Sequence, residues 1–272
     1  MSAKTGASTA VFRDLHAPGG ILVLPNAWDA GSAALIESCG ARAIATTSAA
    51  VAWSHGYPDG QHLPLDVLLQ TVSEIVRIVN VPVSVDFEAG FSNAPAEVAA
   101  KVLKLVDLGV AGINLEDGND PPDLLAAKIE AIKNAVSRAN ADIFVNARTD
   151  VLLRSLVPRE KSTEEILARA ERYTRAGADG LFVPLLSEPD TIVWITREVS
   201  LPVNVMAIPK LAAVPDLRGL GVRRVSAGGA VGRFALASAQ AVVERFLRDG
   251  ESDAMFAYSS KPKEMNALLK RG

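Results

Sequence analysis

One unit recurs along this chain and limits the folds that it can adopt. In each copy a helical pattern ends on a glycine and a short apolar run follows, as in residues 39–48, 108–117, 176–184 and 220–229. The glycines are Gly40, Gly109, Gly177 and Gly221, each placed where a helix end needs a left-handed backbone. The apolar runs of four to six residues are too short for helices and typical of buried strands. The chain is therefore predicted to alternate helices with buried strands.

Eight strands are predicted, because a second set of β-branched-rich runs lies between those of the first set. The predicted strands lie near residues 21–25, 42–46, 82–86, 111–115, 142–146, 179–183, 202–205 and 222–226. Apolar residues at helical spacing fill the intervals. This alternation predicts an α/β protein whose parallel sheet closes into a (β/α)8 TIM barrel. An open doubly wound sheet is the alternative, but its first strand normally leads into a glycine-rich phosphate turn, and here that position reads PNAWDAG.

The barrel is expected to form one domain over residues 1–248. A length of 272 residues is within the range of a single barrel of this class. Residues 249–272 are predicted to form a helical tail with one or two short helices. Such a tail either packs on a neighbouring subunit or covers its own barrel.

Composition and charge narrow the classes of function. The net charge is −3, and no run of five or six like charges supports binding to nucleic acid or to a membrane surface. No stretch of about 18 apolar residues predicts a membrane span, and the N-terminus has no apolar core of a secretory signal. The one cysteine, Cys39, excludes a disulfide within the chain and a zinc site built from cysteines. We expect a cytoplasmic protein.

Polar side chains gather where the predicted strands end, which is the rim that carries the active site in barrel enzymes. The first strand ends at Asn26 and Asp29, the second in hydroxyl side chains, and the seventh at Asn204. The third, fourth and fifth strands end in acidic clusters that comprise Asp86, Glu88, Glu116, Asp117 and Asp150. The Asp-x-Glu spacing puts Asp86 and Glu88 on one face of a strand. So many carboxylates in one mouth repel each other unless a cation is bound, and oxygen ligands favour magnesium or manganese over zinc.

Arg148 is the main positive side chain predicted on this rim. A guanidinium makes a bidentate pair with a substrate carboxylate. A metal that holds the carboxylate and keto oxygens, together with an arginine, suits the binding of a 2-oxo acid. The metal would then stabilise an enolate as negative charge develops on its oxygen.

At this point the motifs resemble those of the isocitrate lyase/phosphoenolpyruvate mutase superfamily along nearly the whole chain. The matching segments, in the same order, are Thr47-Ser48 through GYPDG (56–60), VDFEAGF (85–91), GINLEDG (112–118), NARTD (146–150), GADGLFVP (177–184) and LPVNVM (201–206). Any one of them alone would be a weak signal. Their combination in this order is specific.

The resemblance implies roles for individual residues. Asp86, Glu88 and Glu116 correspond to the carboxylates around the magnesium. Glu116, Asp59 and Arg148 are the candidate catalytic residues, and Asp59 lies on the loop after the second strand, near metal and substrate. The substrate carboxylate is expected on Ser48, the backbone amides of Ala49 and Ala50, and Arg148, with Asn204 matching an active-site position less closely. The resemblance also implies a homo-oligomer, a dimer or a tetramer, with a terminal helix exchanged between subunits.

Departures from the family pattern limit the reaction. The lyases that cleave isocitrate or methylisocitrate carry a cysteine in a KKCGH-like loop after the fourth strand, whereas here LEDGNDPPDLLAAKI runs directly into the next helix. The phosphonate enzymes place Lys and Asn on that loop, and here only Asn119 and Asp120 are available. Decarboxylation of oxaloacetate or cleavage of a substituted malate remains, both through a pyruvate enolate. The alternatives are a phosphonopyruvate or phosphoenolpyruvate enzyme that acts on a C–P bond, and a barrel that binds a 2-oxo acid without turnover.

Each candidate residue also has a structural interpretation. Arg148 could pair with Asp150 or Glu116, and Ser48 could be an ordinary turn cap. Asp59 lies in a loop rich in Gly and Pro, where Asp often stabilises a turn. The carboxylates could form a salt-bridged rim without metal.

Overall fold

A computed structural model describes residues 9–257 and 263–270 of the chain. The parts of the predicted barrel and tail in residues 1–8, 258–262 and 271–272 lie outside the described residues. All strands are parallel and form one sheet in the order β1-β9-β8-β7-β6-β5-β4-β3-β2. The strands are β1 (Leu22–Leu24), β2 (Asn26–Ala27), β3 (Ile44–Thr46), β4 (Val83–Asp86), β5 (Gly112–Glu116), β6 (Phe144–Arg148), β7 (Gly180–Phe182), β8 (Val203–Met206) and β9 (Arg224–Ser226).

The sheet is a barrel whose first strand is interrupted at Pro25. β1 pairs with β9 on one side, and β2 pairs with β3 on the other. Pro25 has no N–H to give to a ladder, but its carbonyl accepts a bond from the Ala45 amide at 3.2 Å. The two short pieces therefore act as one strand that joins both ends of the sheet. This confirms the predicted TIM barrel, because β1 and β2 together are the first of the eight predicted strands.

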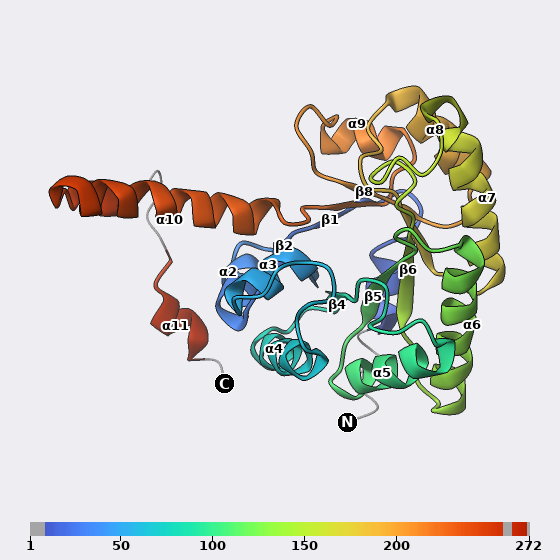
Figure 1. Ribbon diagram of the computed structural model, residues 1–272, viewed down its shortest axis with the longest axis horizontal. Coiled ribbons are helices and arrows are strands. Elements are labelled where there is room, and N and C mark those ends of the chain that lie inside the picture. The colour runs from blue at the N-terminus through green and yellow to red at the C-terminus, as the bar shows by residue number, and fades with distance from the viewer. Residues whose placement is uncertain (1–8, 258–262, 271–272) are drawn as a thin grey trace.

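Helices follow the strands, and those before α10 lie around the outside of the barrel (Figure 1). They are α2 (Ala30–Ser38), α3 (Ser48–Ser54), α4 (Leu65–Ile78), α5 (Pro95–Asp107), α6 (Pro122–Arg138), α7 (Ser162–Arg175), α8 (Pro189–Glu198), α9 (Val214–Gly219), α10 (Ala230–Asp249) and α11 (Met265–Leu269), with 3-10 turns η1 (Arg159–Lys161) and η2 (Asp253–Phe256). The four predicted helix-ending glycines have φ between +92° and +97°, as the helix ends require. The sequence patterns did not predict α3, α9 or the helical turn at residues 9–14. No helix in the described part of the chain has the length and apolar character needed to cross a membrane.

Two separate apolar cores support the barrel. The larger lies between the strands and the surrounding helices. The smaller fills the bottom of the barrel, that is, the end at which the strands begin. There the N-terminal helical turn inserts Phe12 and Leu15 beside Leu22, Leu24 and Phe144. Gly112 makes room for this plug, since a Cβ at that position would lie 2.8 Å from the Phe12 ring. Burial on this scale is the main source of stability for such a fold.

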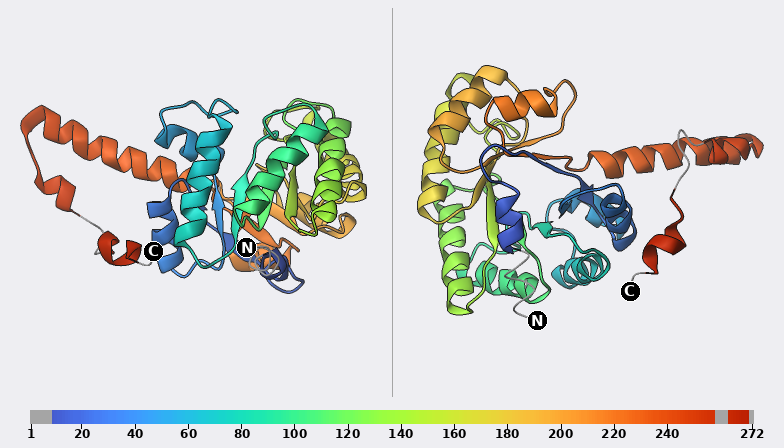
Figure 2. Two further views of the ribbon diagram at one scale, coloured as in Figure 1. Left: turned by 90° about the horizontal axis from the view of Figure 1, so that it is seen from below. Right: turned by 180° about the vertical axis from the view of Figure 1, so that it is seen from behind.

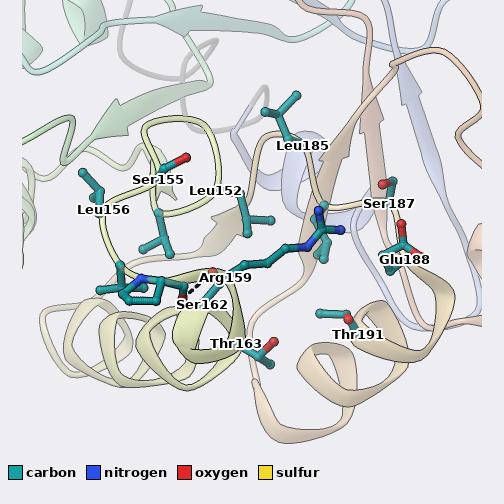
Figure 3. Close-up of a pocket in the computed structure, with 14 residues that line it drawn as sticks. Leu152, Ser155, Leu156, Arg159, Ser162, Thr163, Leu185, Ser187, Glu188 and Thr191 are labelled. Carbon is teal, nitrogen blue, oxygen red and sulfur yellow. Dashed lines mark hydrogen bonds between the residues drawn. The ribbon is translucent and has the colours of Figure 1, made fainter.

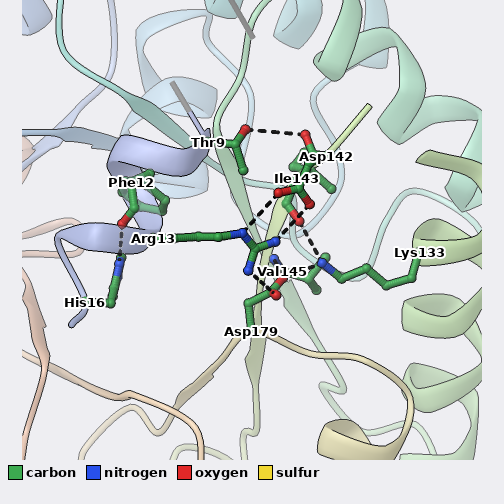
Figure 4. Close-up of polar contacts among 9 residues, drawn as sticks. All are labelled: Thr9, Phe12, Arg13, His16, Lys133, Asp142, Ile143, Val145 and Asp179. Atoms are coloured by element: carbon green, nitrogen blue, oxygen red, sulfur yellow. Dashed lines mark hydrogen bonds and ion pairs between the residues drawn. The ribbon is translucent and has the colours of Figure 1, made fainter. Parts of the chain in front are cut away.

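A cluster of charges fastens the same plug to the bottom of the barrel (Figure 4). Arg13 donates to both carboxylate oxygens of Asp142, at 3.0 and 2.8 Å, and it also pairs with Asp179. Lys133 of α6 pairs with Asp179 and donates to the Ile143 carbonyl at 2.8 Å. Every charge in this cluster therefore has an opposite charge or a dipole within hydrogen-bond distance.

Helix α10 leaves the barrel and projects away from it as an arm (Figures 1 and 2). Its side chains are almost all exposed, including Phe234 at 75% and Leu247 at 79%. The described part of the tail then returns to α2 of the same chain, where Lys263 donates to the Ser38 carbonyl at 2.6 Å. The tail does contain the short helical pieces that were expected, η2 and α11. The domain boundary at residue 248 stays a prediction.

Candidate active site

The predicted site residues of β4, β5 and β6 meet at the carboxyl ends of these neighbouring strands. Parallel register places Glu116 beside Arg148 and Asp86 beside Asn114. Arg148 Nη1 lies 2.7 Å from Glu116 Oε2. The strand ends thus bring Asp86, Glu116 and Arg148 to one mouth of the barrel, as their predicted positions at the ends of parallel strands require.

Arg148 is held on one side by Asp150. Its Nε donates to Asp150 Oδ1 at 2.7 Å and its Nη2 to Asp150 Oδ2 at 3.1 Å, while the guanidinium lies 5.8 Å from the centre of the Phe182 ring. Burial lowers the pKa of Arg148, but the carboxylates of Glu116 and Asp150 outweigh it and raise the pKa above its usual value. Arg148 is therefore a fixed cation with N–H groups left over after these contacts.

Asp86 has one oxygen in use and one without a partner. Its Oδ2 accepts from the Ser48 amide at 3.0 Å, and its own N–H donates to Thr46 Oγ1 at 2.9 Å. Its Oδ1 is buried and has no hydrogen-bond partner among the described residues. A buried carboxylate oxygen without a donor is costly, so it suggests a missing partner at this position.

Glu88 lies in an unusual turn just after β4. Its φ is +49°, a conformation that side chains rarely adopt, and its Oε2 accepts from the Gln61 amide at 2.6 Å. Two lysines fasten the turn from outside, because Lys128 donates to the Ala89 carbonyl at 2.8 Å and Lys101 to the Phe91 carbonyl at 2.7 Å. Strained residues that the surroundings hold in place are typical of functional sites.

The carboxylates at the mouth disfavour each other's charge. Burial raises the pKa of Glu88 to about 7, with further contributions from the negative charges of Asp86 and Asp59. The pKa of Glu116 is raised to about 8, chiefly by burial and also by the negative charges of Asp86, Asp150 and Glu88, against the opposing effect of Arg148. Arg148 therefore does not offset the effect of burial and of the neighbouring carboxylates, and ionisation of Glu88 and Glu116 is disfavoured.

The residues predicted to bind the substrate carboxylate form the first turn of α3. Ser48, Ala49 and Ala50 begin this helix beside Asp86, and the Ser48 amide is already engaged by that carboxylate. Amides in a first turn have no partner within the helix, which makes them available to an anion. Asp59 is exposed on the following loop, and its negative charge contributes to the raised pKa of Glu88.

Asn204 lies deeper, in a polar layer inside the barrel. Its Oδ1 accepts from Asn146 at 3.1 Å, and its Nδ2 donates to the Val205 carbonyl at 2.6 Å and to Ser226 Oγ at 3.1 Å. The same layer contains the fully buried Arg224, whose Nη2 donates to Asn114 Oδ1 at 3.2 Å. The Asn204 side chain is thus occupied by its neighbours, and its role toward substrate stays a prediction.

Asp117 departs from the predicted pattern. The sequence groups it with Glu116 at the mouth, but the structure turns its side chain toward α7, where it accepts from Arg169 and Tyr173. Sequence reasoning did not identify these two partners. A signal was present, because Glu165, Arg169 and Tyr173 follow each other at intervals of four residues on one helix.

The residues around the mouth suit a divalent cation by chemistry but are not gathered as a closed cluster. Within residues 9–257 and 263–270, no group of three or more His, Cys, Asp or Glu side chains is close enough to hold a metal ion. Asp86, Glu88 and Glu116 offer only oxygen donors, and Asp86 Oδ1 lacks a partner. Magnesium keeps several waters and binds through few direct carboxylates, so this set fits it without closer approach of the side chains.

A cavity of about 610 Å³ lies beside the mouth, between the segments that follow β6 and β7. Leu152, Leu156 and Leu185 line it together with hydroxyl side chains, and Arg159 extends across it near Ser187 (Figure 3). Neither the three predicted metal ligands nor Arg148 contributes to its wall. The cavity is therefore separate from the carboxylates of the mouth.

Comparison with known proteins assigns a family to this geometry. The sequence profile of the phosphoenolpyruvate phosphomutase family matches residues 12–247. An uncharacterized protein of Mycobacterium tuberculosis is 40% identical over 247 residues, which cover 88% of this chain and 90% of that protein. An oxaloacetate decarboxylase of Pseudomonas entomophila is 29% identical over 80% of this chain and 78% of its own length.

A solved structure gives the same result. It is a Burkholderia cenocepacia J2315 protein that has been classed provisionally as a phosphonomutase. It is 39% identical to this chain, with a TM-score of 0.83, and the match covers 87% of this chain and 99% of that protein. The family match over residues 12–247 includes the positions of all the candidate site residues.

Proposed function

This chain belongs to the phosphoenolpyruvate phosphomutase family of the isocitrate lyase/phosphoenolpyruvate mutase superfamily, and we propose that it is a magnesium-dependent lyase or decarboxylase. Its substrate is a small 2-oxo acid or a substituted malate that passes through a pyruvate enolate. The superfamily comprises lyases and mutases, and lyases of this kind generally depend on a divalent metal. The observation that carries the proposal is the group of carboxylates at the mouth, with Asp86 Oδ1 buried and without a partner, next to an arginine held by Glu116 and Asp150.

In this proposal Asp86, Glu88 and Glu116 hold the magnesium, and manganese would suit the same oxygen donors. The metal, when bound, supplies a positive charge that stabilises the enolate oxygen. Arg148 binds the substrate carboxylate through N–H groups that Asp150 and Glu116 leave over. The first turn of α3 adds the amides of Ala49 and Ala50. Asp59 approaches from the loop after α3 and completes the polar wall.

The short segment after β5 supports C–C chemistry without the cysteine acid. Only residues 117–121 lie between β5 and α6, which leaves no room for a long gating loop. One observation favours the alternative, a C–P bond enzyme, namely the 39% identity with the protein classed as a phosphonomutase. The two candidate functions differ in substrate and share the site.

The test is the release of pyruvate with magnesium and with EDTA. The substrates are oxaloacetate, 2-methylmalate, 2,3-dimethylmalate and phosphonopyruvate. Glu116→Ala removes a proposed ligand, and Glu130→Ala, an exposed glutamate of α6, is the matched control. We expect magnesium-dependent release from a C–C substrate that is lost in Glu116→Ala and retained in Glu130→Ala. Release from phosphonopyruvate alone would select the C–P alternative, and no release from any substrate would contradict the pyruvate-enolate proposal.

The protein is also proposed to be a homo-oligomer that buries the arm α10 against a second copy. Phe234, Leu236 and Leu247 are exposed on this helix, and Val23 on β1 is 52% exposed on the outside of the barrel. Apolar surface of this extent is typical of protein–protein contacts. The tail after residue 248, where exchange was expected, also exposes apolar side chains, Phe256 at 69% and Leu269 at 40%. Phe234→Glu should lower the mass measured by analytical ultracentrifugation, and an unchanged mass would contradict this assembly.

A further inference from the structure

Asp117 is the centre of a buried network that joins α7 to the ends of β5 and β6. Its Oδ2 accepts from Tyr173 Oη at 2.6 Å and from Arg169 Nη1 at 2.8 Å. Its Oδ1 accepts from the backbone amide of Asp150 at 2.8 Å. Asp117 is fully buried and its carboxylate is satisfied by three donors, so the position of each donor is closely defined.

Two of the three donors come from one face of α7, and that face points at the barrel. Arg169 and Tyr173 are both buried, and Arg169 Nε also donates to Glu165 Oε1 at 2.7 Å. A barrel helix normally presents apolar side chains to the strands. Burying a guanidinium and a hydroxyl there costs solvation, and replacing such groups by apolar ones is often neutral for stability. Stability alone therefore does not account for this polar face.

The network leads directly to the arginine of the candidate active site. The Asp150 amide is fixed by Asp117, and the Asp150 side chain holds Arg148 through two hydrogen bonds. The backbone of Arg148 is fixed as well, because its carbonyl accepts from the Asp117 amide at 3.2 Å. Asp117 thus fixes the main chain at Arg148 directly. Through Asp150 it also fixes the plane of the Arg148 guanidinium.

We propose that Tyr173 and Arg169 are positioning residues for Arg148. Through Asp117 and Asp150 they fix the direction in which the guanidinium presents its remaining N–H groups to the mouth. They touch no reacting atom. The consequence for substrate rests on the proposed function, in which Arg148 binds the substrate carboxylate, but the orientation of the guanidinium can be measured without any substrate.

The first experiment measures hydrogen exchange of the Arg148 Nε–H by nitrogen-15 NMR, with the signal assigned through Arg148→Lys. Tyr173→Phe removes one donor to Asp117 and preserves the ring. Arg172→Met is the matched control, because it breaks an exposed ion pair between α7 and Asp123 without touching Asp117. We expect exchange to accelerate about fivefold in Tyr173→Phe, as for the loss of one hydrogen bond, and to stay unchanged in Arg172→Met.

Arg169→Lys is the conservative variant that retains the charge beside Asp117. It should give a smaller acceleration than Arg169→Met, and melting temperatures will show whether each variant is folded. Equal exchange in the wild type, Tyr173→Phe and Arg169→Met would overturn the proposal. Equal acceleration in Arg172→Met would also overturn it, because any loosening of α7 would then suffice.

The second experiment links the network to binding at the mouth. Oxalate, a planar dianion shaped like pyruvate enolate, is titrated in the presence of magnesium. Tyr173→Phe should weaken oxalate binding about fivefold and raise KM by a similar factor, with little change in kcat or in the magnesium affinity. If exchange changes but the wild type binds no oxalate, the positioning role stands and the proposed function fails. If the wild type binds oxalate and the variant binds it equally well, the positioning role toward substrate is overturned and the proposed function stands.

Discussion

The two ends of the barrel both bury charged groups, and they do so with opposite results. At the bottom, Arg13 and Lys133 face Asp142 and Asp179, so positive and negative charges are matched (Figure 4). At the mouth, Arg148 pairs with Glu116 and Asp150, whereas Asp86 and Glu88 form no ion pair with a basic side chain of the described residues. Burial alone would raise the pKa of Asp142, but Arg13 holds it below its usual value, whereas the pKa values of Glu88 and Glu116 rise to about 7 and 8.

The difference indicates which end serves stability and which serves function. A carboxylate whose pKa is lowered by folding stabilises the folded state at neutral pH, and one whose pKa is raised destabilises it. The bottom therefore contributes to the free energy of unfolding, and the mouth subtracts from it. Sites that depart from good electrostatics in this way are expected where a ligand supplies the missing charge.

The largest effect at the mouth is expected for Glu116→Gln. We expect turnover to fall by about a thousandfold, because a charged group aimed at the reacting centre is lost. The free energy of unfolding should stay equal or rise, since a buried carboxylate with a raised pKa is replaced by a neutral group. Steady-state kinetics and urea unfolding at neutral pH measure the two effects. A large loss of stability would instead show that Glu116 serves mainly as the structural partner of Arg148.

Arg13→Met, at the bottom, should lower the free energy of unfolding and leave turnover unchanged. It leaves Asp142 without its ion-pair partner and Asp179 with Lys133 alone, and we expect a loss of about 1 to 2 kcal/mol, between the values for exposed and buried pairs because Arg13 and Asp142 are partly exposed. Turnover per folded molecule should not change. Urea unfolding and active-site titration test this, and a fall in kcat with intact stability would show that the bottom is coupled to the mouth.

The pH dependence of stability separates the ends further through His16. This residue stacks on Phe144 at the bottom, and burial, followed by the nearby charge of Arg224, lowers its pKa to about 3. The unfolded chain takes up a proton below about pH 6.5, where the folded protein keeps the ring neutral, so stability is lost as the pH falls below that value. Between pH 7.5 and 5 this loss should be about 2 kcal/mol.

The raised pKa values of Glu88 and Glu116 act in the opposite direction over the same range, because protonation relieves the mouth. His16→Phe keeps a stacked ring without the titration. The difference in unfolding free energy between this variant and the wild type, measured from pH 7.5 to 5, isolates the histidine. A constant difference would contradict a neutral buried His16.

Sequence patterns predicted the fold better than they predicted the contacts of the site. The spacing of apolar residues and the length of each apolar run depend only on local sequence, so they predicted the eight strands and most helices to within a few residues. The rim argument also placed Asp86, Glu116 and Arg148 together, because parallel register depends only on strand order. Side-chain direction after a strand ends is not local, and Asp117 turns away because Arg169 and Tyr173 lie 52 and 56 residues further along the chain.

The smallest change in stability is expected inside the barrel, at Ser84. Ser84 points into the barrel one turn of the pleat below Asp86, and its buried hydroxyl has no partner among the described residues. If the mouth end tolerates unsatisfied polar groups, Ser84→Ala should leave stability unchanged or raise it by up to about 1 kcal/mol. Thermal and urea unfolding would measure this, with Thr71→Ala as the control because the Thr71 hydroxyl is bonded and its loss should destabilise. A loss of stability in Ser84→Ala would contradict this prediction and show that the buried hydroxyl stabilises the fold.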